Sequence, residues 1–312
     1  MKKINIVATV VLCIMLFTAV TNKSYAYLTV DGSTYSVSEL VEDILLGGGI
    51  TVNSITFTGR DKDDPTYDAS VGTFNGDESN IGIDEGIFLG SGRIIDAPGP
   101  NDYWNITYQI YTGGDDDLDQ IIFPYSTYDA TVIKFEFVPL FKKISFKYVF
   151  ASEEYREFVC SEFNDVFGFF ISGPGIHGDF TDDAVNIATV PDTNVYVAIN
   201  NVNDACHDTV DGADEYCSYW GSCDSSFSEY FVCNTSTCQD TTSVEFDGFT
   251  KVFTAEIDSL TPCKKYVIKL AVADASDMQW DSGVFLEAGS FESLGEYGGT
   301  EVAVCSDEER KI

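Results

Sequence analysis

Alternating apolar and polar positions run through most of this chain and predict β-strands. The alternation is clearest in two segments, 133–137 and 144–150, which a short loop containing Pro139 separates. Side chains of a strand point to opposite faces in turn, so each segment has one apolar face. Two such segments around a short loop predict an antiparallel hairpin.

Other segments show the same pattern or are apolar throughout. Apolar side chains alternate at 253–257 and 266–272, whereas 166–171 and 284–286 are continuous apolar runs. Continuous runs are typical of strands with both faces covered, so we expect these two strands to lie centrally in a sheet. Further strands are expected at 195–199 and near 244–246.

One helix is predicted near the N-terminus. Ser36 and Glu39 have the spacing of a capping box, and apolar residues between 40 and 46 supply one buried face. Gly47–Gly49 ends the helix. We expect it to pack across an end or edge of a sheet.

Many strands, few helices and abundant turn residues predict an all-β fold. We expect a two-sheet, jelly-roll-like β-sandwich with one short N-terminal helix and a disulfide-rich loop insertion. The 17 tyrosines and 23 phenylalanines are enough aromatic bulk for a sizeable core. We expect one domain over 27–298, a Cys-rich insertion over 204–240 and a C-terminal tail over 299–312.

The N-terminal residues 1–26 have the features of a secretory signal peptide. Lys2 and Lys3 precede an apolar stretch, Ile4–Val20, and a small residue, Ala26, ends the segment. An uncleaved membrane anchor is the alternative interpretation. No later segment is apolar and long enough to cross a membrane.

The chain is strongly acidic. Removal of residues 1–26 takes away three lysines and no acid, which leaves 14 basic and 51 acidic residues and a formal charge of −37. This charge argues against nucleic acid as a partner, because such proteins need a basic surface. Bound cations would relieve the repulsion, although acidity that serves only solubility explains the composition equally well.

Eight cysteines remain after the signal peptide, and an even number in an exported chain predicts disulfides. The spacing does not choose among the 105 pairings that eight cysteines allow. The sequence has no CxxC pair, so it does not suggest a zinc site. The predicted disulfide cysteines are Cys160, Cys206, Cys217, Cys223, Cys233, Cys238, Cys263 and Cys305.

Acidic residues stand at the ends of the predicted strands. Glu153 and Glu154 follow one apolar run, and Asp165 precedes the next. An inward-facing carboxylate must be paired or bind a metal, because an unpaired buried charge is costly. The alternative is that these acids cap loop amides or meet a lysine or arginine. We expect at least one of the three to bind a metal or a ligand.

Two further acidic motifs are candidate calcium ligands. The first is Asp115-x-Asp117-x-Asp119, whose oxygens can converge on a hard cation if the loop is tight. The motif lacks the remainder of an EF-hand pattern. A solvated acidic turn is the alternative interpretation. The second is the loop between Asp274 and Asp281. Trp280 in that loop is a candidate ligand-binding side chain, with packing in the core or at its edge as the alternative.

Several long motifs in order resemble the choice-of-anchor L family of secreted bacterial proteins. ASEEY at 151–155 and FNDVFGFFISGPGI at 163–176 carry the resemblance, together with GIDEGIFLGSG at 82–92 and the long block at 246–291. No activity is firmly attached to this family. Its members carry varied C-terminal anchoring or sorting domains, whereas this chain stops soon after Phe291, so we expect free secretion or attachment through a partner.

Together these features predict a secreted or cell-surface, non-catalytic module. We expect it to bind Ca²⁺ through the acidic loops and to recognise an extracellular glycan or protein surface. Two alternatives remain: a glycan-active enzyme that uses a carboxylate pair, and a structural subunit of an extracellular assembly. Catalytic motifs are lacking, with neither G-x-S-x-G nor H-E-x-x-H present.

Overall fold

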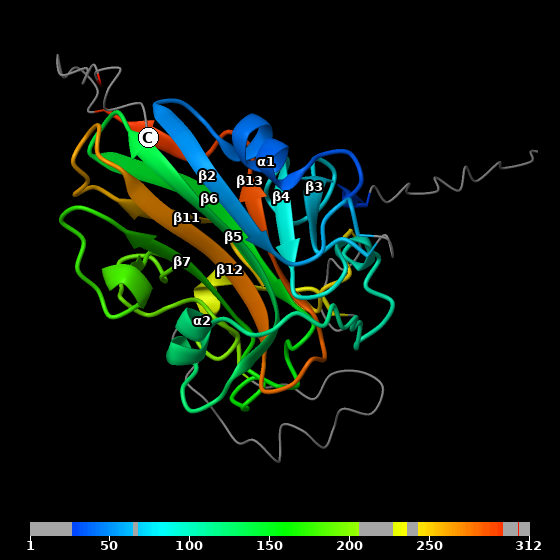
Figure 1. Ribbon diagram of the computed structural model, residues 1–312. Helices are drawn as coiled ribbons and strands as arrows, with labels where there is room; N and C mark the ends of the chain where they lie inside the picture. The colour runs from blue at the N-terminus through cyan, green and yellow to red at the C-terminus, as the bar shows by residue number, and fades with distance from the viewer. Residues whose placement is uncertain (1–26, 65–67, 206–226, 236–242, 296–304, 306–312) are drawn as a thin grey trace, which may run out of the picture.

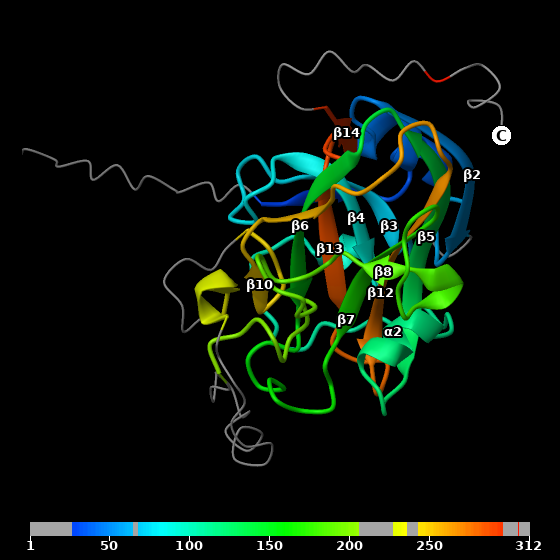
Figure 2. The ribbon, with the colours of Figure 1, turned by 90° about the vertical axis from the view of Figure 1, so that its left-hand side faces the viewer.

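The computed structural model describes residues 27–64, 68–205, 227–235 and 243–295, together with Cys305. Two antiparallel sheets, one of nine strands and one of five, face each other (Figure 1). The predicted all-β, two-sheet sandwich is confirmed. Figure 2 shows the layers from the side, with β6 and β13 in one and β7 and β12 in the other.

The larger sheet has the spatial order β1 (Thr29–Asp31), β3 (Val71–Asn75), β4 (Glu85–Gly90), β13 (Ser282–Glu287), β6 (Lys143–Ser152), β10 (Gly248–Thr250) and β9 (Phe231–Cys233). Two more strands pair with β6, namely β11 (Phe253–Ile257) and β14 (Glu292–Leu294). The smaller sheet has the order β2 (Ile50–Thr58), β5 (Thr127–Pro139), β12 (Tyr266–Ala275), β7 (Val166–Ser172) and β8 (Val185–Asn186).

Aromatic side chains from both sheets fill the space between them. Phe146 of β6 meets Phe169 of β7 with ring centroids 4.9 Å apart, and Phe135 and Phe137 of β5 pack against Phe291. All five rings are buried. Burial of these large side chains is the main favourable term that holds the two sheets together.

The predicted hairpin of 133–137 with 144–150 is wrong. The first segment lies in β5, which pairs with β2 and β12, and the second lies in β6, which pairs with strands of the other sheet. The chain crosses from one sheet to the other at residues 140–142. Alternation shows that each strand has an inward face, but strands on opposite sheets have equivalent inward faces, so the pattern cannot say which sheet a strand joins.

The other strand predictions are mostly confirmed. The two continuous apolar runs form β7 and β13, and each lies between two neighbouring strands; the alternating runs form β11 and β12. The strands expected at 195–199 and 244–246 are instead irregular chain with isolated bridges, such as Val166 to Ala198 and Pro98 to Val244.

The N-terminal helix begins where the sequence predicts. Ser36 and Glu39 form a capping box, and α1 (Val37–Glu39) continues as a π-helical turn, Leu40–Leu45. Its apolar residues Leu40, Val41 and Leu45 are buried in the core. A second short helix, α2 (Asp116–Ile121), covers the outer face of the smaller sheet. Single 3₁₀ turns occur at Ile94–Asp96, Thr181–Asp183 and Ser228–Tyr230.

One disulfide joins Cys263 to Cys305, with the two Cα atoms 5.3 Å apart. Cys160 and Cys233 are disulfide-bonded as well. Four predicted disulfide cysteines lie outside the described residues, as does much of the 204–240 insertion: Cys206, Cys217, Cys223 and Cys238. Within that insertion, the structure has the edge strand β9 where a loop was expected, paired with β10.

The predicted signal peptide, residues 1–26, also lies outside the described residues. In the part of the chain that the structure describes, no helix has both the length and the apolar character that a membrane span requires.

Candidate functional site: a buried carboxylate cluster

The ends of five strands place acidic residues together at one end of the sandwich. In the larger sheet, Ser152 at the end of β6 is opposite both Ser282, which begins β13, and Gly248, which begins β10. Glu153 therefore lies near Asp281 and Asp247, the residues that precede those two strands. The antiparallel register, rather than proximity in sequence, brings these side chains together.

The smaller sheet contributes acids at the same end. Val166 of β7 is opposite Ala273 of β12, which places Asp165 beside Asp274. Asp165 accepts hydrogen bonds from the Ala275 backbone at 2.8 Å and from the Ser282 hydroxyl at 2.6 Å. Because Ser282 belongs to the other sheet, this one carboxylate connects both layers of the sandwich.

We call this group the carboxylate cluster. Its members influence one another electrostatically, and each is at most 5% exposed. They are Glu153, Glu154, Glu157, Asp165, Glu245, Asp247, Asp274 and Asp281.

Several oxygens of the cluster are buried without a hydrogen-bond partner. These are both carboxylate oxygens of Glu154 and of Asp274, and one oxygen each of Glu153 and Asp247. The Ser91 hydroxyl is 3.3 Å from the Ser282 carbonyl and close enough to Asp274 to oppose the rise in the pKa of that carboxyl, although it does not meet hydrogen-bond geometry with either Asp274 oxygen. Buried polar atoms in proteins are normally satisfied, so a concentration of unpartnered oxygens at one place indicates a missing partner.

Burial raises the pKa of six carboxyls of the cluster well above the ordinary value, and neighbouring acids raise it further: Glu153, Glu154, Asp165, Asp247, Asp274 and Asp281. The pKa of Glu154 lies well above its ordinary value because of burial and then because of Asp165, Asp277 and Asp274. At the edge of the cluster, burial raises the pKa of Glu245 to about 7, against two backbone hydrogen bonds that oppose the shift. The group must therefore be neutralised by protons or by cations.

Other residues hold the cluster in shape. Asp281 accepts from the Tyr108 backbone at 3.0 Å to each oxygen, and a Cβ at Gly92 would lie 1.6 Å from its Oδ2. Only glycine at position 92 allows this approach. Arg156, the one basic residue between Glu153 and Asp165, pairs instead with Asp204.

Five of the predicted metal ligands thus lie in one cluster: Glu153, Glu154, Asp165, Asp274 and Asp281. Sequence reasoning missed Glu245 and Asp247, and it did not include Glu157 among the ligands although Glu157 stands in the same acidic turn as Glu153 and Asp165. Asp247 directly precedes a strand, as Asp165 and Asp281 do, and this placement was the available signal. Glu245 precedes no strand directly, and only the fold brings it near Asp247.

The carboxylate cluster offers oxygen donors of several kinds, but its side chains do not form a complete metal-binding site. Among the described residues, no three His, Cys, Asp or Glu side chains are grouped so that they could hold a metal ion. Calcium takes six to eight oxygen ligands and accepts hydroxyl groups, backbone carbonyls and water beside carboxylates. The unpartnered oxygens of the cluster, with the hydroxyls of Ser91 and Ser282, are donors of that chemistry.

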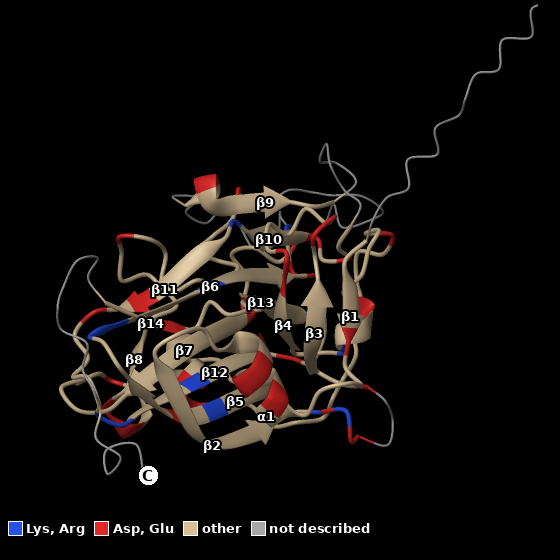
Figure 3. Cartoon of the chain, turned by 90° about the horizontal axis from the view of Figure 1, so that it is seen from above, with Lys and Arg blue, Asp and Glu red and all other residues tan. Residues whose placement is uncertain are grey.

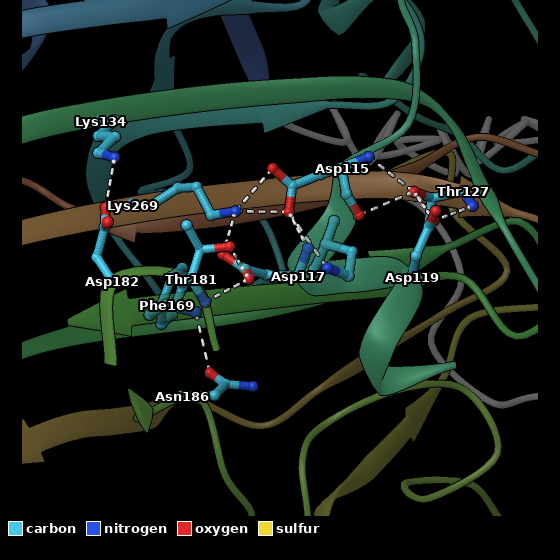
Figure 4. Close-up of polar contacts among 11 residues, drawn as sticks. Asp115, Asp117, Asp119, Thr127, Lys134, Phe169, Thr181, Asp182, Asn186 and Lys269 are labelled. Carbon is cyan, nitrogen blue, oxygen red and sulfur yellow. Dashed lines mark hydrogen bonds and ion pairs between the residues drawn. The ribbon is translucent and has the colours of Figure 1, made fainter. Parts of the chain in front are cut away.

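The motif Asp115-x-Asp117-x-Asp119 lies elsewhere, at the start of α2 (Figure 4). Lys269 of β12 places its ammonium 2.6 Å from Asp115 Oδ1 and 2.6 Å from Asp117 Oδ2. Asp119 turns away to accept from Thr127. Although burial alone would raise it, the pKa of Asp117 stays below its ordinary value because of Lys269 and Thr181. The structure does not bring these three aspartates into the carboxylate cluster.

Trp280 lies in a small aromatic group beside the cluster. Its ring is half-buried and packs on Phe158, with centroids 4.7 Å apart, and lies 6.3 Å from the ring of Trp104. Its indole nitrogen is buried without a hydrogen-bond partner. Trp280 thus packs against other aromatic side chains, and its role in ligand binding stays a prediction.

The fold and the cluster define a class of protein: an acidic, disulfide-linked β-sandwich whose unusual chemistry lies at one end of its two sheets. The sequence model of the Choice-of-anchor L domain matches residues 29–292, nearly the whole chain, and the chain belongs to that family. Membership indicates a secreted or surface-anchored, non-catalytic module. A comparison with curated proteins gave no match, and neither did one with solved structures.

Proposed function

We propose that this protein is an extracellular recognition module whose carboxylate cluster binds Ca²⁺ and thereby orders the loops around it. The observation that carries the proposal is the set of four buried, unpartnered oxygens on Glu154 and Asp274. A divalent cation would neutralise the surrounding acids and supply the missing partner. Calcium fits better than zinc because the donors are all oxygen.

Loop ordering follows from which segments the cluster connects. Asp281 holds the 104–111 loop through the Tyr108 backbone, and Asp165 joins β7 to β12 and β13. Repulsion among unneutralised carboxylates would push these segments apart. A bound cation would attract these carboxylates and hold the segments together. The loops around the cluster would therefore be rigid only with calcium present.

The geometry favours this role over glycoside hydrolysis. A catalytic acid must reach the substrate, whereas Glu153, Glu154 and Asp165 are at most 1% exposed. Carboxyls buried inside a sandwich can bind a cation, but they cannot contact a sugar chain at the surface.

The test is metal analysis and thermal unfolding of the purified chain without residues 1–26. We expect bound calcium and a Tm about 5–10 °C lower in EDTA than in calcium at one hundred times the Kd, since such binding stabilises by about 2.7 kcal/mol. Magnesium, which dehydrates reluctantly, should have a smaller effect. Identical unfolding curves in calcium and EDTA, with no metal found, would refute the proposal.

A further inference from the structure

A second site lies on the surface beside the carboxylate cluster. It is a pocket with a cavity volume of about 380 Å³ between the 104–111 loop and the loop after β12. Among the described residues, its lining consists of Thr107, Tyr108, Gln109, Tyr111 and Gln279. We call it the tyrosine pocket.

The chemistry of the tyrosine pocket is unusual for this chain. All five lining side chains are neutral, in a protein with 51 acidic residues. A cationic partner would be recognised by carboxylates, and an anionic one would need basic side chains and would be repelled by the net charge of −34. Amides, hydroxyls and aromatic rings instead suit a molecule with many neutral hydroxyl groups and apolar C–H faces.

The walls of the pocket are held in place by both loops. Thr107 Oγ1 and Gln109 Nε2 each donate to the Met278 carbonyl, at 3.4 Å, and the Asp281 backbone donates to the Ile106 carbonyl at 3.1 Å. Tyr108 donates its hydroxyl to Asp68 and lies under the Arg93 guanidinium, 4.1 Å from the ring centroid. A fixed Tyr108 ring costs little further ordering when a ligand binds.

Tyr111 is the second aromatic wall, and its backbone is strained. Its φ is +58°, in the left-handed region that glycine favours, and its side chain is 72% exposed. Of the described non-glycine residues with positive φ, the two aromatic ones are Tyr111 and Trp280, on the two loops that form the pocket. A large exposed ring on a strained backbone is better explained by binding than by packing.

We propose that the tyrosine pocket binds a neutral oligosaccharide, with the Tyr111 ring against a sugar face and Gln109 and Gln279 on its hydroxyls. The proposal deepens the proposed function and rests on it in one respect: Asp281 of the carboxylate cluster fixes the Tyr108 backbone, so calcium would strengthen sugar binding.

The experiment is an array of immobilised neutral glucans, mannans, galactans and N-acetylglucosamine oligomers, with alginate and hyaluronan as charged counterparts. It is probed with the protein in calcium and in EDTA, and the best neutral oligosaccharide is then titrated by calorimetry. We expect binding to neutral members, a Kd at least tenfold weaker for Gln279→Ala, and loss of binding for Tyr111→Ala. Tyr125→Ala is the control, since Tyr125 is a surface tyrosine outside the pocket, 41% exposed, and this variant should bind normally.

A second variant separates binding from folding. Tyr111→Gly removes the ring and the strain together, so it should keep or raise the Tm while it abolishes binding. No binding to any neutral oligosaccharide, or binding that survives both Tyr111 variants, would overturn the inference. If calcium raises the Tm but no glycan binds, this inference fails while the proposed function stands; glycan binding that is equal in EDTA supports the pocket and counts against calcium-ordered loops.

Discussion

At the scale of single residues, the main finding is that the acids of this chain are not confined to its surface. Glu153, Glu154, Asp165 and Asp274 are as inaccessible as the core phenylalanines. A buried carboxylate without a partner costs several kcal/mol, and each such neighbour adds to the cost for the others. Their retention at the ends of three strands, β6, β7 and β12, therefore requires compensation from protons or a cation.

Glu154→Gln tests this at one position. The amide keeps the shape and removes the charge, so in EDTA at pH 7 the Tm should stay equal or rise by about 1–3 °C, because repulsion falls. In calcium the variant should lose at least half of the wild-type stabilisation. Thermal unfolding in both buffers checks this, with the exposed Glu229→Gln as control. Equal destabilisation in both buffers would instead assign Glu154 a purely structural role.

At the scale of elements, charge plays a different part on the outer face of the smaller sheet. Figure 3 shows basic positions on both β12 and β5. In the strand register, Lys269 of β12 is opposite Lys134 of β5. Lys269 is covered by α2 and pairs with Asp115 and Asp117, whereas Lys134 meets Asp182 in an exposed pair. Paired lysine and aspartate thus fix α2 against the sheet, where the sequence motif alone suggested a cation site.

Lys269→Met should therefore destabilise the protein by about 2–4 kcal/mol, because two largely buried carboxylates lose their partner. Lys134→Met, the cross-strand control, should change stability by less than about 0.5 kcal/mol, since exposed pairs contribute little. Urea unfolding measures both. Similar values for the two variants would show that α2 is not held by this ion pair.

Strand periodicity also explains how far the sequence could predict the structure. It predicted β7, β12 and β13 correctly, because burial on one or both faces leaves a local pattern. It misassigned β5 and β6 to one hairpin, since pairing depends on which sheet a strand enters and both sheets share one core. Five cluster residues were predictable because they adjoin apolar strands. Glu245 was not predictable, because it lies in irregular chain and only the tertiary fold brings it near Asp247.

At the scale of the whole molecule, the cluster makes stability depend on pH. Carboxyls with raised pKa bind protons more tightly in the folded than in the unfolded protein, so stability falls as pH rises from the unfolded towards the folded pKa. For Glu245 this window runs from about 4.5 to about 7, and for Asp129, buried nearby, from about 3.8 to about 6. Most soluble domains gain stability from their acids over the same range.

In EDTA, we expect the free energy of unfolding to decrease between pH 4.5 and 7 by roughly 1–2 kcal/mol for each of these two groups. Calcium should reduce the decrease, since it substitutes for the protons that are lost. Denaturant unfolding at half-unit pH intervals measures the slope. A free energy of unfolding that is constant or increases over this interval in EDTA would contradict the electrostatic account.

The Cys263–Cys305 disulfide has a mechanical consequence. It attaches residue 305 beside the start of β12, and the carboxylate cluster lies at the other end of the same strand. β12 is hydrogen-bonded on both sides, to β5 and to β7. A force applied at Cys305 would enter a strand flanked on both edges and be shared as shear across three strands. A ligand held in the tyrosine pocket would oppose that force at the far end of the same strand.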